Sequence, residues 1–81
     1  SPHYLNTRAI INLDWSKSEE AMVDLKKAIS IENNIHFHGN LGIAYYNLHR
    51  DLEALEQYDI VLSVEPNNVV QLNNKSQALI H

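Results

Sequence analysis

Amide side chains are the groups in this sequence best suited to a binding chemistry. Six of them fall in three separate segments: Asn6, Asn40, Asn47, Asn73, Asn74 and Gln77. An amide offers a hydrogen-bond donor and an acceptor together, so it can pair with the N–H and the C=O of an extended polypeptide whatever the sequence of that polypeptide. These groups therefore favour the binding of a peptide backbone.

Five histidines raise the alternative of a metal site or of acid–base catalysis. His36 and His38 are two residues apart, which on a helix directs them to opposite sides. The sequence has no His-Glu-x-x-His pattern, no cysteine, no Gly-x-Ser-x-Gly motif and no phosphate-binding glycine loop. We therefore expect no metal, no cofactor and no enzymatic activity.

The elements that carry these groups repeat along the chain. A shift of 33 residues pairs Glu20 with Glu53, Ala21 with Ala54, Leu25 with Tyr58, Ala9 with Gly42 and Glu32 with Glu65. A shift of 34 residues then pairs His38 with Leu72, Asn40 with Asn74, Gly42 with Ser76 and Tyr45 with Leu79. We divide the single domain, 1–81, into a first repeat over 1–34, a second over 35–68 and the first helix of a third over 69–81.

The second repeat carries the clearest motif. It reads His38-x-x-Leu41-Gly42-x-x-Tyr45, then Ala54-x-x-x-Tyr58, then Pro66. This resembles the tetratricopeptide repeat family, whose pattern is Trp-x-x-Leu-Gly-x-x-Tyr, Ala-x-x-x-Phe and Pro. Small side chains at Gly42 and Ala54 allow two antiparallel helices to approach closely, and Pro66 cannot continue the second helix. The first repeat is more degenerate, because Arg8 and Asn12 replace the Leu and the Tyr of the pattern.

The predicted fold is all-α: an α-α superhelix of antiparallel helical hairpins with five helices, as in tetratricopeptide repeats. The apolar spacing fits a helix better than a strand, and two glycines and two prolines leave little room for long loops. We expect helices over 4–14, 18–31, 36–48, 52–64 and 69–80. Ser18, Asp51 and Asn68 are the expected N-caps. Asp24 and Lys27, three residues apart, are positioned to pair on the outer face.

The resemblance implies that the first helix of each repeat lines a concave groove. The groove residues it implies are Asn6, Ile10, His36, Asn40, Ile43, Tyr46, Asn47, Asn73, Asn74 and Gln77. Asn40 and Asn74 are equivalent by register and resemble the asparagine ladders of related scaffolds. Asn6 joins this ladder if the first repeat is shifted by one residue; otherwise Thr7 holds the equivalent position. Ile10, Ile43 and Ile80 lie between the amides as candidate apolar pockets.

We therefore expect a protein–protein interaction module, an adaptor or scaffold that binds an extended peptide of a partner protein. One alternative is an architectural or self-association segment of a larger repeat protein, working through exposed end helices as a homo-oligomer. Another is that the amides only solvate an exposed face. A chaperone-tail clamp of the same family is disfavoured, because Asn6, Ile10, Val70 and Asn74 replace its cationic and amide donors.

Charge and hydropathy exclude two further classes of partner. The net charge is −4 and the six basic residues form no stripe, so we expect no nucleic acid. The longest uncharged run, 33–49, is interrupted by Asn and His side chains, so we expect no membrane span. No signal peptide is visible, which favours a cytoplasmic location, although a chain that begins Ser-Pro without Met is consistent with an excised piece of a longer superhelix.

Overall fold

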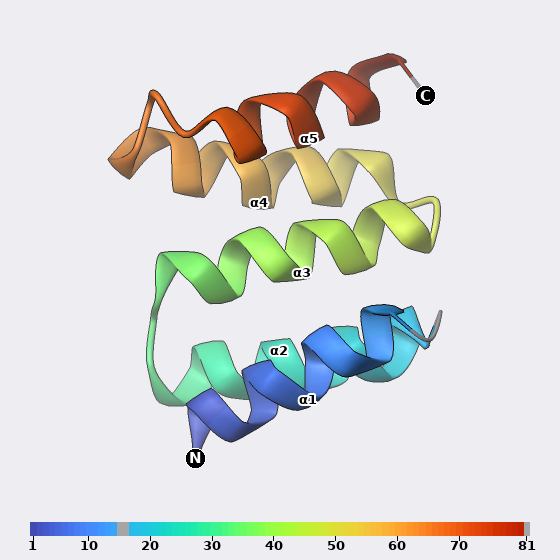
Figure 1. The fold of residues 1–81 in the computed structure, drawn as a ribbon, viewed down its shortest axis with the longest axis vertical. Coiled ribbons are helices and arrows are strands. Elements are labelled where there is room, and N and C mark those ends of the chain that lie inside the picture. Colours follow the sequence, from blue (N-terminus) through green and yellow to red (C-terminus); the bar gives the residue numbers. More distant parts are fainter. Residues whose placement is uncertain (15–16, 81) are drawn as a thin grey trace.

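The computed structural model describes residues 1–14 and 17–80, and in these residues it has five α-helices and no strand (Figure 1). Their bounds are α1 Pro2–Asp14, α2 Ser18–Ile31, α3 Ile35–Asn47, α4 Asp51–Val64 and α5 Val69–Ile80. Each helix begins and ends within two residues of the range expected from the sequence. The predicted all-α fold is confirmed.

The helices form two antiparallel hairpins followed by a single helix (Figure 1). α1 packs on α2 and α3 packs on α4, while α2 contacts α3 and α4 contacts α5. α1 also touches α3, and α3 touches α5. The three odd-numbered helices therefore lie in one row, and it is this row that positions the amide side chains.

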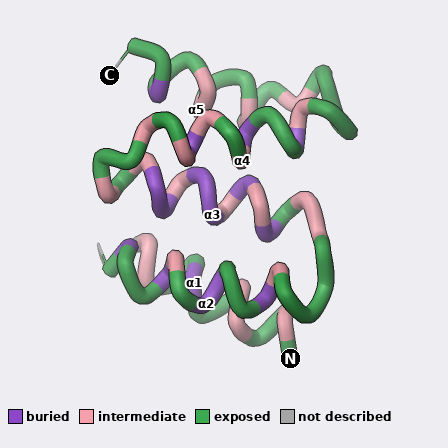
Figure 2. The backbone as a smooth tube through the Cα atoms, turned by 180° about the vertical axis from the view of Figure 1, so that it is seen from behind, coloured by how far each residue is buried: buried purple, intermediate pink, exposed green. Residues whose placement is uncertain are grey.

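The core runs between the helices of each hairpin and along both sides of α3 (Figure 2). The three residues assigned to the core from the motif, Leu41, Tyr45 and Tyr58, are buried. Phe37, which the register left unassigned, is also buried, at 1% exposure, and the His3 ring lies edge-on to it with centroids 5.5 Å apart. The first hairpin thus covers the amino end of α3.

Gly42 is the closest point of contact within the second hairpin. A Cβ atom placed on Gly42 would lie 2.7 Å from Cδ1 of Tyr58 and still closer to Cε1, distances that real Cβ atoms essentially never show. Glycine at this position therefore makes room for an aromatic ring from α4. The requirement for a small residue, expected from the motif, is confirmed at Gly42, and the side chain that imposes it is Tyr58.

Asparagine side chains cap two of the helices. The Asn34 carboxamide oxygen accepts the His36 N–H at 2.8 Å at the start of α3, and the Asn68 oxygen accepts the Gln71 N–H at 3.1 Å at the start of α5. The prediction for Asn68 is confirmed, whereas the predictions for Ser18 and Asp51 are wrong. α2 and α4 begin at these residues, after Lys17 and Arg50, which make no side-chain cap hydrogen bond.

The turn between α3 and α4 closes with a left-handed residue. His49 has φ 63°, and the Arg50 N–H donates to the Tyr45 carbonyl at 2.8 Å while the His49 N–H donates to the Tyr46 carbonyl at 3.0 Å. This is a Schellman motif, in which glycine is the usual left-handed residue.

Among the described helices, none is long and apolar enough to cross a membrane.

Candidate functional site

Asn6 and Asn40 meet across the row of odd-numbered helices. Asn40 Nδ2, on α3, donates to Asn6 Oδ1, on α1, at 2.8 Å, and the pair is part-buried. The two residues are 34 positions apart, so the first repeat is shifted by one residue at this point. Thr7, the alternative for this position, instead donates its hydroxyl to the His3 carbonyl at 2.9 Å. Of the two alternatives, the structure brings Asn6 next to Asn40.

Asn74 holds the equivalent position on α5 but does not extend the pairing. Its Nδ2 is buried and has no hydrogen-bond acceptor among residues 1–14 and 17–80. Gln71, one turn earlier, has a buried Oε1 in the same condition, and its amide group lies against Gly39, where a Cβ would come within 2.8 Å of Nε2. Gln71 and Asn74 of α5 thus each have one buried polar atom without a hydrogen-bond partner in the described chain. The equivalent amides of α1 and α3, by contrast, bond to each other.

The other predicted site residues differ in accessibility. His36, Asn47, Asn73, Gln77 and Ile10 are exposed. Ile43 and Tyr46 are half-buried and pack against the core. All of them lie on α1, α3 or α5, which are neighbours. Whether they bind a peptide stays a prediction, but the helices that carry them do form one continuous row.

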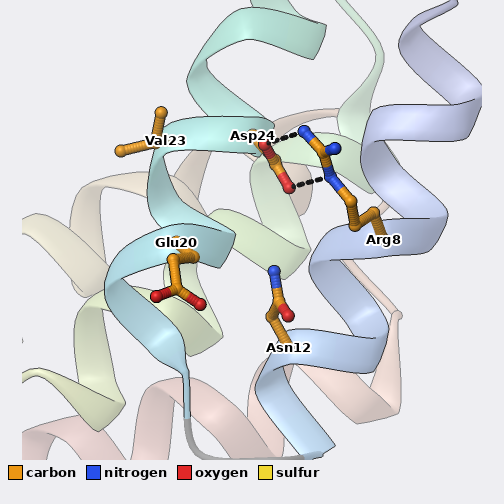
Figure 3. Close-up of a pocket in the computed structure, with 5 residues that line it drawn as sticks. All are labelled: Arg8, Asn12, Glu20, Val23 and Asp24. Carbon is orange, nitrogen blue, oxygen red and sulfur yellow. Dashed lines mark hydrogen bonds and ion pairs between the residues drawn. The ribbon is translucent and has the colours of Figure 1, made fainter.

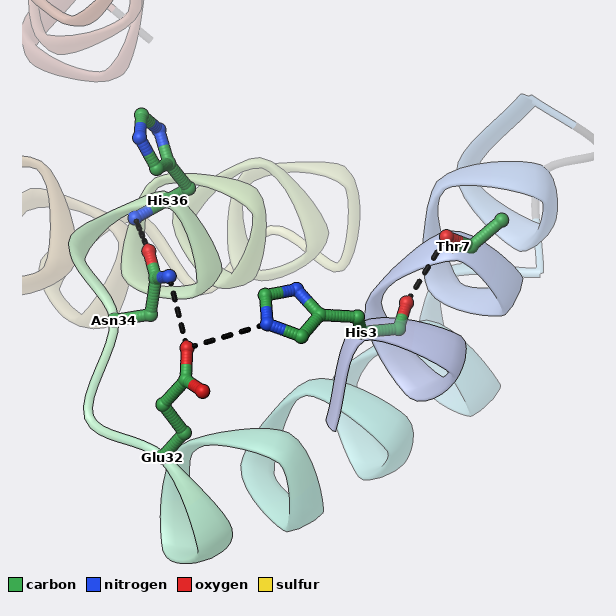
Figure 4. Close-up of polar contacts among 5 residues, drawn as sticks. All are labelled: His3, Thr7, Glu32, Asn34 and His36. Carbon is green, nitrogen blue, oxygen red and sulfur yellow. Dashed lines mark hydrogen bonds and ion pairs between the residues drawn. The ribbon is translucent and has the colours of Figure 1, made fainter. Parts of the chain in front are cut away.

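A polar network ties the amino end of α1 to the turn between α2 and α3 (Figure 4). Asn34 Nδ2 donates to Glu32 Oε2 at 3.1 Å, and His3 Nε2 lies 3.5 Å from the same oxygen. The side chain of His36 is exposed on α3, while its backbone N–H is held by Asn34. This network holds the amino end of α1 close to the amino end of α3, which are neighbours in the row of odd-numbered helices.

A pocket of about 350 Å³ opens between α1 and α2, away from the amide row (Figure 3). Its lining is Arg8, Asn12, Glu20, Val23 and Asp24. Arg8 binds Asp24 through two hydrogen bonds of 2.8 Å, and the bond and charge of that carboxylate raise the pKa of the Arg8 guanidinium. The predicted pair of Asp24 with Lys27 is wrong, because the buried Asp24 carboxylate is bound by Arg8 instead. The signal for this pocket was the replacement of the Leu and Tyr of the motif by Arg8 and Asn12.

Metal-ligating side chains do not gather elsewhere in the described part of the chain. No group of three or more His, Asp or Glu residues lies close enough to hold a metal ion in residues 1–14 and 17–80. The described residues thus form an all-α fold of helical hairpins in which amide and apolar side chains lie together on α1, α3 and α5.

Comparisons with known proteins add a relative. No family model matches the sequence. A protein O-mannosyl-transferase of Caenorhabditis elegans is 41% identical to the chain over 51 residues. These residues are 62% of the chain and 7% of the length of that protein. The chain therefore resembles a small segment of a much larger transferase.

This similarity overturns the expectation that enzymatic activity is excluded. The relative is named as a transferase, so the prediction that the chain has no enzymatic activity is wrong as stated. The reason is one of scale. The prediction rested on a search of 81 residues for catalytic groups, and such a search cannot bear on the other 93% of a transferase of which 7% matches.

Proposed function

We propose that the chain is a tetratricopeptide-type repeat segment. Three features support this assignment. The second repeat carries the motif His38-x-x-Leu41-Gly42-x-x-Tyr45, the hairpins pack α1 on α2 and α3 on α4, and the ring of Tyr58 occupies the space beside Gly42. The hydrogen bond between residues 34 positions apart, Asn6 and Asn40, matches the length of such a repeat.

We propose further that the face formed by α1, α3 and α5 binds an extended polypeptide by its backbone. The observation that carries the proposal is the Asn40 to Asn6 hydrogen bond of 2.8 Å. This bond uses one Nδ2 proton of Asn40 and one lone pair of Asn6, so each amide retains both donor and acceptor capacity. The retained groups fit the N–H and C=O groups of a peptide laid across the helices. Ile10 and Ile43 lie beside them and supply apolar contacts for its side chains.

The similarity to a protein O-mannosyl-transferase favours one class of polypeptide for this face. The name of that protein states that it acts on proteins. As part of a larger transferase of this kind, a face that grips backbone amides without regard to sequence would present acceptor polypeptides to a catalytic domain elsewhere in the protein. The proposed occupant is therefore an unfolded or extended segment of an acceptor protein.

A selection with random peptides tests the binding proposal directly. Dodecapeptides displayed on phage would be selected against the immobilised chain, and the recovered peptides would be measured by calorimetry. We expect the double variant Asn40→Ala/Asn74→Ala to weaken binding by at least about tenfold, because each amide contributes roughly 1 kcal/mol or more to a paired backbone group.

The matched control is Asn67→Ala, which removes an exposed amide from the turn between α4 and α5. It should leave the affinity unchanged. Selected peptides that bind the double variant as tightly as the original chain would refute the amide mechanism. A failure to recover any peptide, together with concentration-dependent sedimentation of the chain alone, would favour the architectural alternative.

A further inference from the structure

Met22 is the only sulfur-containing residue of this chain, because the sequence has one methionine and no cysteine. Its side chain is half-buried on α2 and packs against the core. By register Leu55 holds the same place on α4, and it also packs against the core while half-buried. Hydrocarbon is thus sufficient for packing at this position, and packing alone does not require a sulfur atom at Met22.

The sulfur atom of Met22 accepts a hydrogen bond from the guanidinium of Arg50. Arg50 Nη1 lies 3.2 Å from Met22 Sδ, the two residues are 28 positions apart, and the contact lies at the surface. Arg50 immediately precedes α4, so this contact joins α2, in the first hairpin, to the start of α4, in the second. A thioether sulfur is a weak acceptor, so a charged donor is combined here with a weak partner.

Groups other than Met22 hold Arg50 in place. Its Nε and Nη2 donate to the two carboxylate oxygens of Glu53 at 2.7 and 2.8 Å, and its Cζ lies 5.0 Å from the centroid of the Tyr45 ring. Its backbone N–H donates to the Tyr45 carbonyl and closes the turn after α3. The guanidinium that presents Nη1 to the sulfur is therefore already fixed, and little conformational entropy is lost if a better acceptor takes that bond.

We propose that Met22 is a site of reversible oxidation to methionine sulfoxide, and that Arg50 binds the oxidised form. The oxidant is hydrogen peroxide, which reaches the contact from solvent because the contact lies at the surface. A sulfur lone pair forms a bond to one peroxide oxygen while the O–O bond breaks. The proton on the transferred oxygen passes to the departing hydroxide, and water leaves. The sulfur loses two electrons and the peroxide gains them.

Oxidation of Met22 strengthens its contact with Arg50. A sulfoxide oxygen is polar and accepts hydrogen bonds better than a thioether sulfur, and a bond to it from a guanidinium is charge-assisted. In a packed site without a donor, the same oxygen would be removed from water without a partner and would disrupt the packing. At Met22, rotation about the Cγ–Sδ bond brings the oxygen to Arg50 Nη1. The sulfoxide therefore tightens the link between the two hairpins.

A comparison of reduced and oxidised chains, with and without Arg50, tests the proposal. Each chain would be treated with hydrogen peroxide, the gain of one oxygen at Met22 would be verified by mass spectrometry, and unfolding in urea would be measured. Oxidation should leave the unfolding equilibrium constant of the original chain unchanged or lower it. In Arg50→Ala, oxidation should raise that constant at least about fivefold relative to its effect in the original chain, because the sulfoxide has lost its charged donor.

Two variants of α2 serve as controls. Met22→Leu introduces the residue that Leu55 supplies at the equivalent position, and its unfolding should not respond to peroxide. Lys26→Ala removes the other cation near the Tyr45 ring, whose Nζ lies 5.8 Å from the ring centroid. Oxidation should affect Lys26→Ala as it affects the original chain. A response of Lys26→Ala as large as that of Arg50→Ala would refute the specific role of Arg50.

The stereochemistry of the sulfoxide gives a second test that needs no variant. In the folded chain one lone pair of the Met22 sulfur faces Arg50 Nη1, so peroxide approaches the other lone pair and one epimer forms in excess. In the urea-unfolded chain both epimers form. The two classes of methionine sulfoxide reductase each reduce one epimer, with two electrons from a dithiol, and restore the thioether with release of water. One class should therefore reduce most of the sulfoxide made in the folded chain, whereas each should reduce about half of that made in urea.

Two further results would overturn the inference. The first is that oxidation raises the unfolding equilibrium constant of the original chain as much as that of Arg50→Ala. The second is that the folded chain yields the same mixture of epimers as the unfolded chain, since the Met22 sulfur would then not be held against Arg50.

Discussion

The two complete hairpins solve the same packing problem with different side chains. In the second, Gly42 receives the ring of Tyr58; in the first, Ala9 is matched with Leu25. A smaller residue on one helix is thus combined with a larger one on the other, so the hairpins keep the same arrangement. The comparison teaches that the repeat maintains the summed volume at the contact rather than the residue type.

The hairpins differ more strongly at the residue that immediately precedes Ala9 and Gly42. Leu41 is buried in the second, whereas Arg8, its equivalent in the first, binds Asp24. α3 has neighbours on both sides, but in the described chain α1 has only α2 and α3 against it. A position that is apolar between two hairpins therefore becomes an ion pair at the end of the row.

The largest expected effect comes from exchanging the contact residues of the second hairpin for those of the first. Gly42→Ala should destabilise the chain by about 1–2 kcal/mol, because the overlap with the Tyr58 ring exceeds the gain in helix propensity. In a Tyr58→Leu background the same substitution should become stabilising. Urea unfolding of the original chain and the three variants measures both effects, and an unchanged sign of the Gly42→Ala effect would show that the volume rule is wrong.

Alkaline pH should destabilise the chain through Tyr58 of the second hairpin. Burial, with smaller effects of the Tyr46 and Asp51 charges, raises the pKa of Tyr58 from 10.0 to about 12. The unfolded chain therefore ionises first, so this group leaves stability unchanged below pH 10 and lowers it as the pH rises from 10 towards 12. Relative to Tyr58→Phe, the original chain should lose about 1.4 kcal/mol at about pH 11. Urea midpoints at about pH 8 and about pH 11 measure this; parallel losses in both chains would contradict it.

The ion pair of the first hairpin should respond unequally to loss of its two partners. Arg8→Ala leaves a carboxylate with 9% side-chain exposure unpaired, whereas Asp24→Ala leaves a guanidinium with 48% exposure that water can solvate. Thermal unfolding should therefore show the larger drop for Arg8→Ala. Lys75→Ala is the control, because the Lys75–Asp59 pair is exposed on both sides and should change stability by less than about 0.5 kcal/mol. Equal losses for Arg8→Ala and Asp24→Ala would refute the argument.

The smallest effect is expected where the two hairpins touch through amides. Asn40→Ala removes the bond to Asn6 and should cost about 0.5–1 kcal/mol. Asn6→Ala should cost as much, and the double variant should lose little more than either. Strictly additive losses in urea unfolding would mean that the two amides do not act as a pair.

The helices and their order were predictable because the repeat fixes where small and large side chains recur. The same register made no assignment for Phe37, and its equivalent in the first repeat, Tyr4, is 61% exposed. Phe37 is buried because the first hairpin precedes it, and Tyr4 has no such neighbour in the described chain. Burial at a repeat boundary thus depends on the neighbouring copy and not on the residue's own position.

The candidate site was predictable in part for a related reason. Spacing indicated that Asn40 and Asn74 are equivalent but left Asn6 and Thr7 as alternatives, and only the shift of α1 against α3 brings Asn6 next to Asn40. For Asp24, Lys27 on the same helix was the nearer cation in sequence, yet packing of α1 brings Arg8 to the buried carboxylate. Local spacing identifies the candidate partners, and tertiary packing chooses between them.

The left-handed backbone of His49 has a consequence for the integrity of the second hairpin. The left-handed conformation costs a residue with a side chain about 1–2 kcal/mol, and this cost would disappear if residues 47–52 became helical. Such a change would merge α3 and α4 into one long helix and release α4 to another molecule. Domain swapping at high concentration would thus begin at this turn, and glycine at position 49 would suppress it.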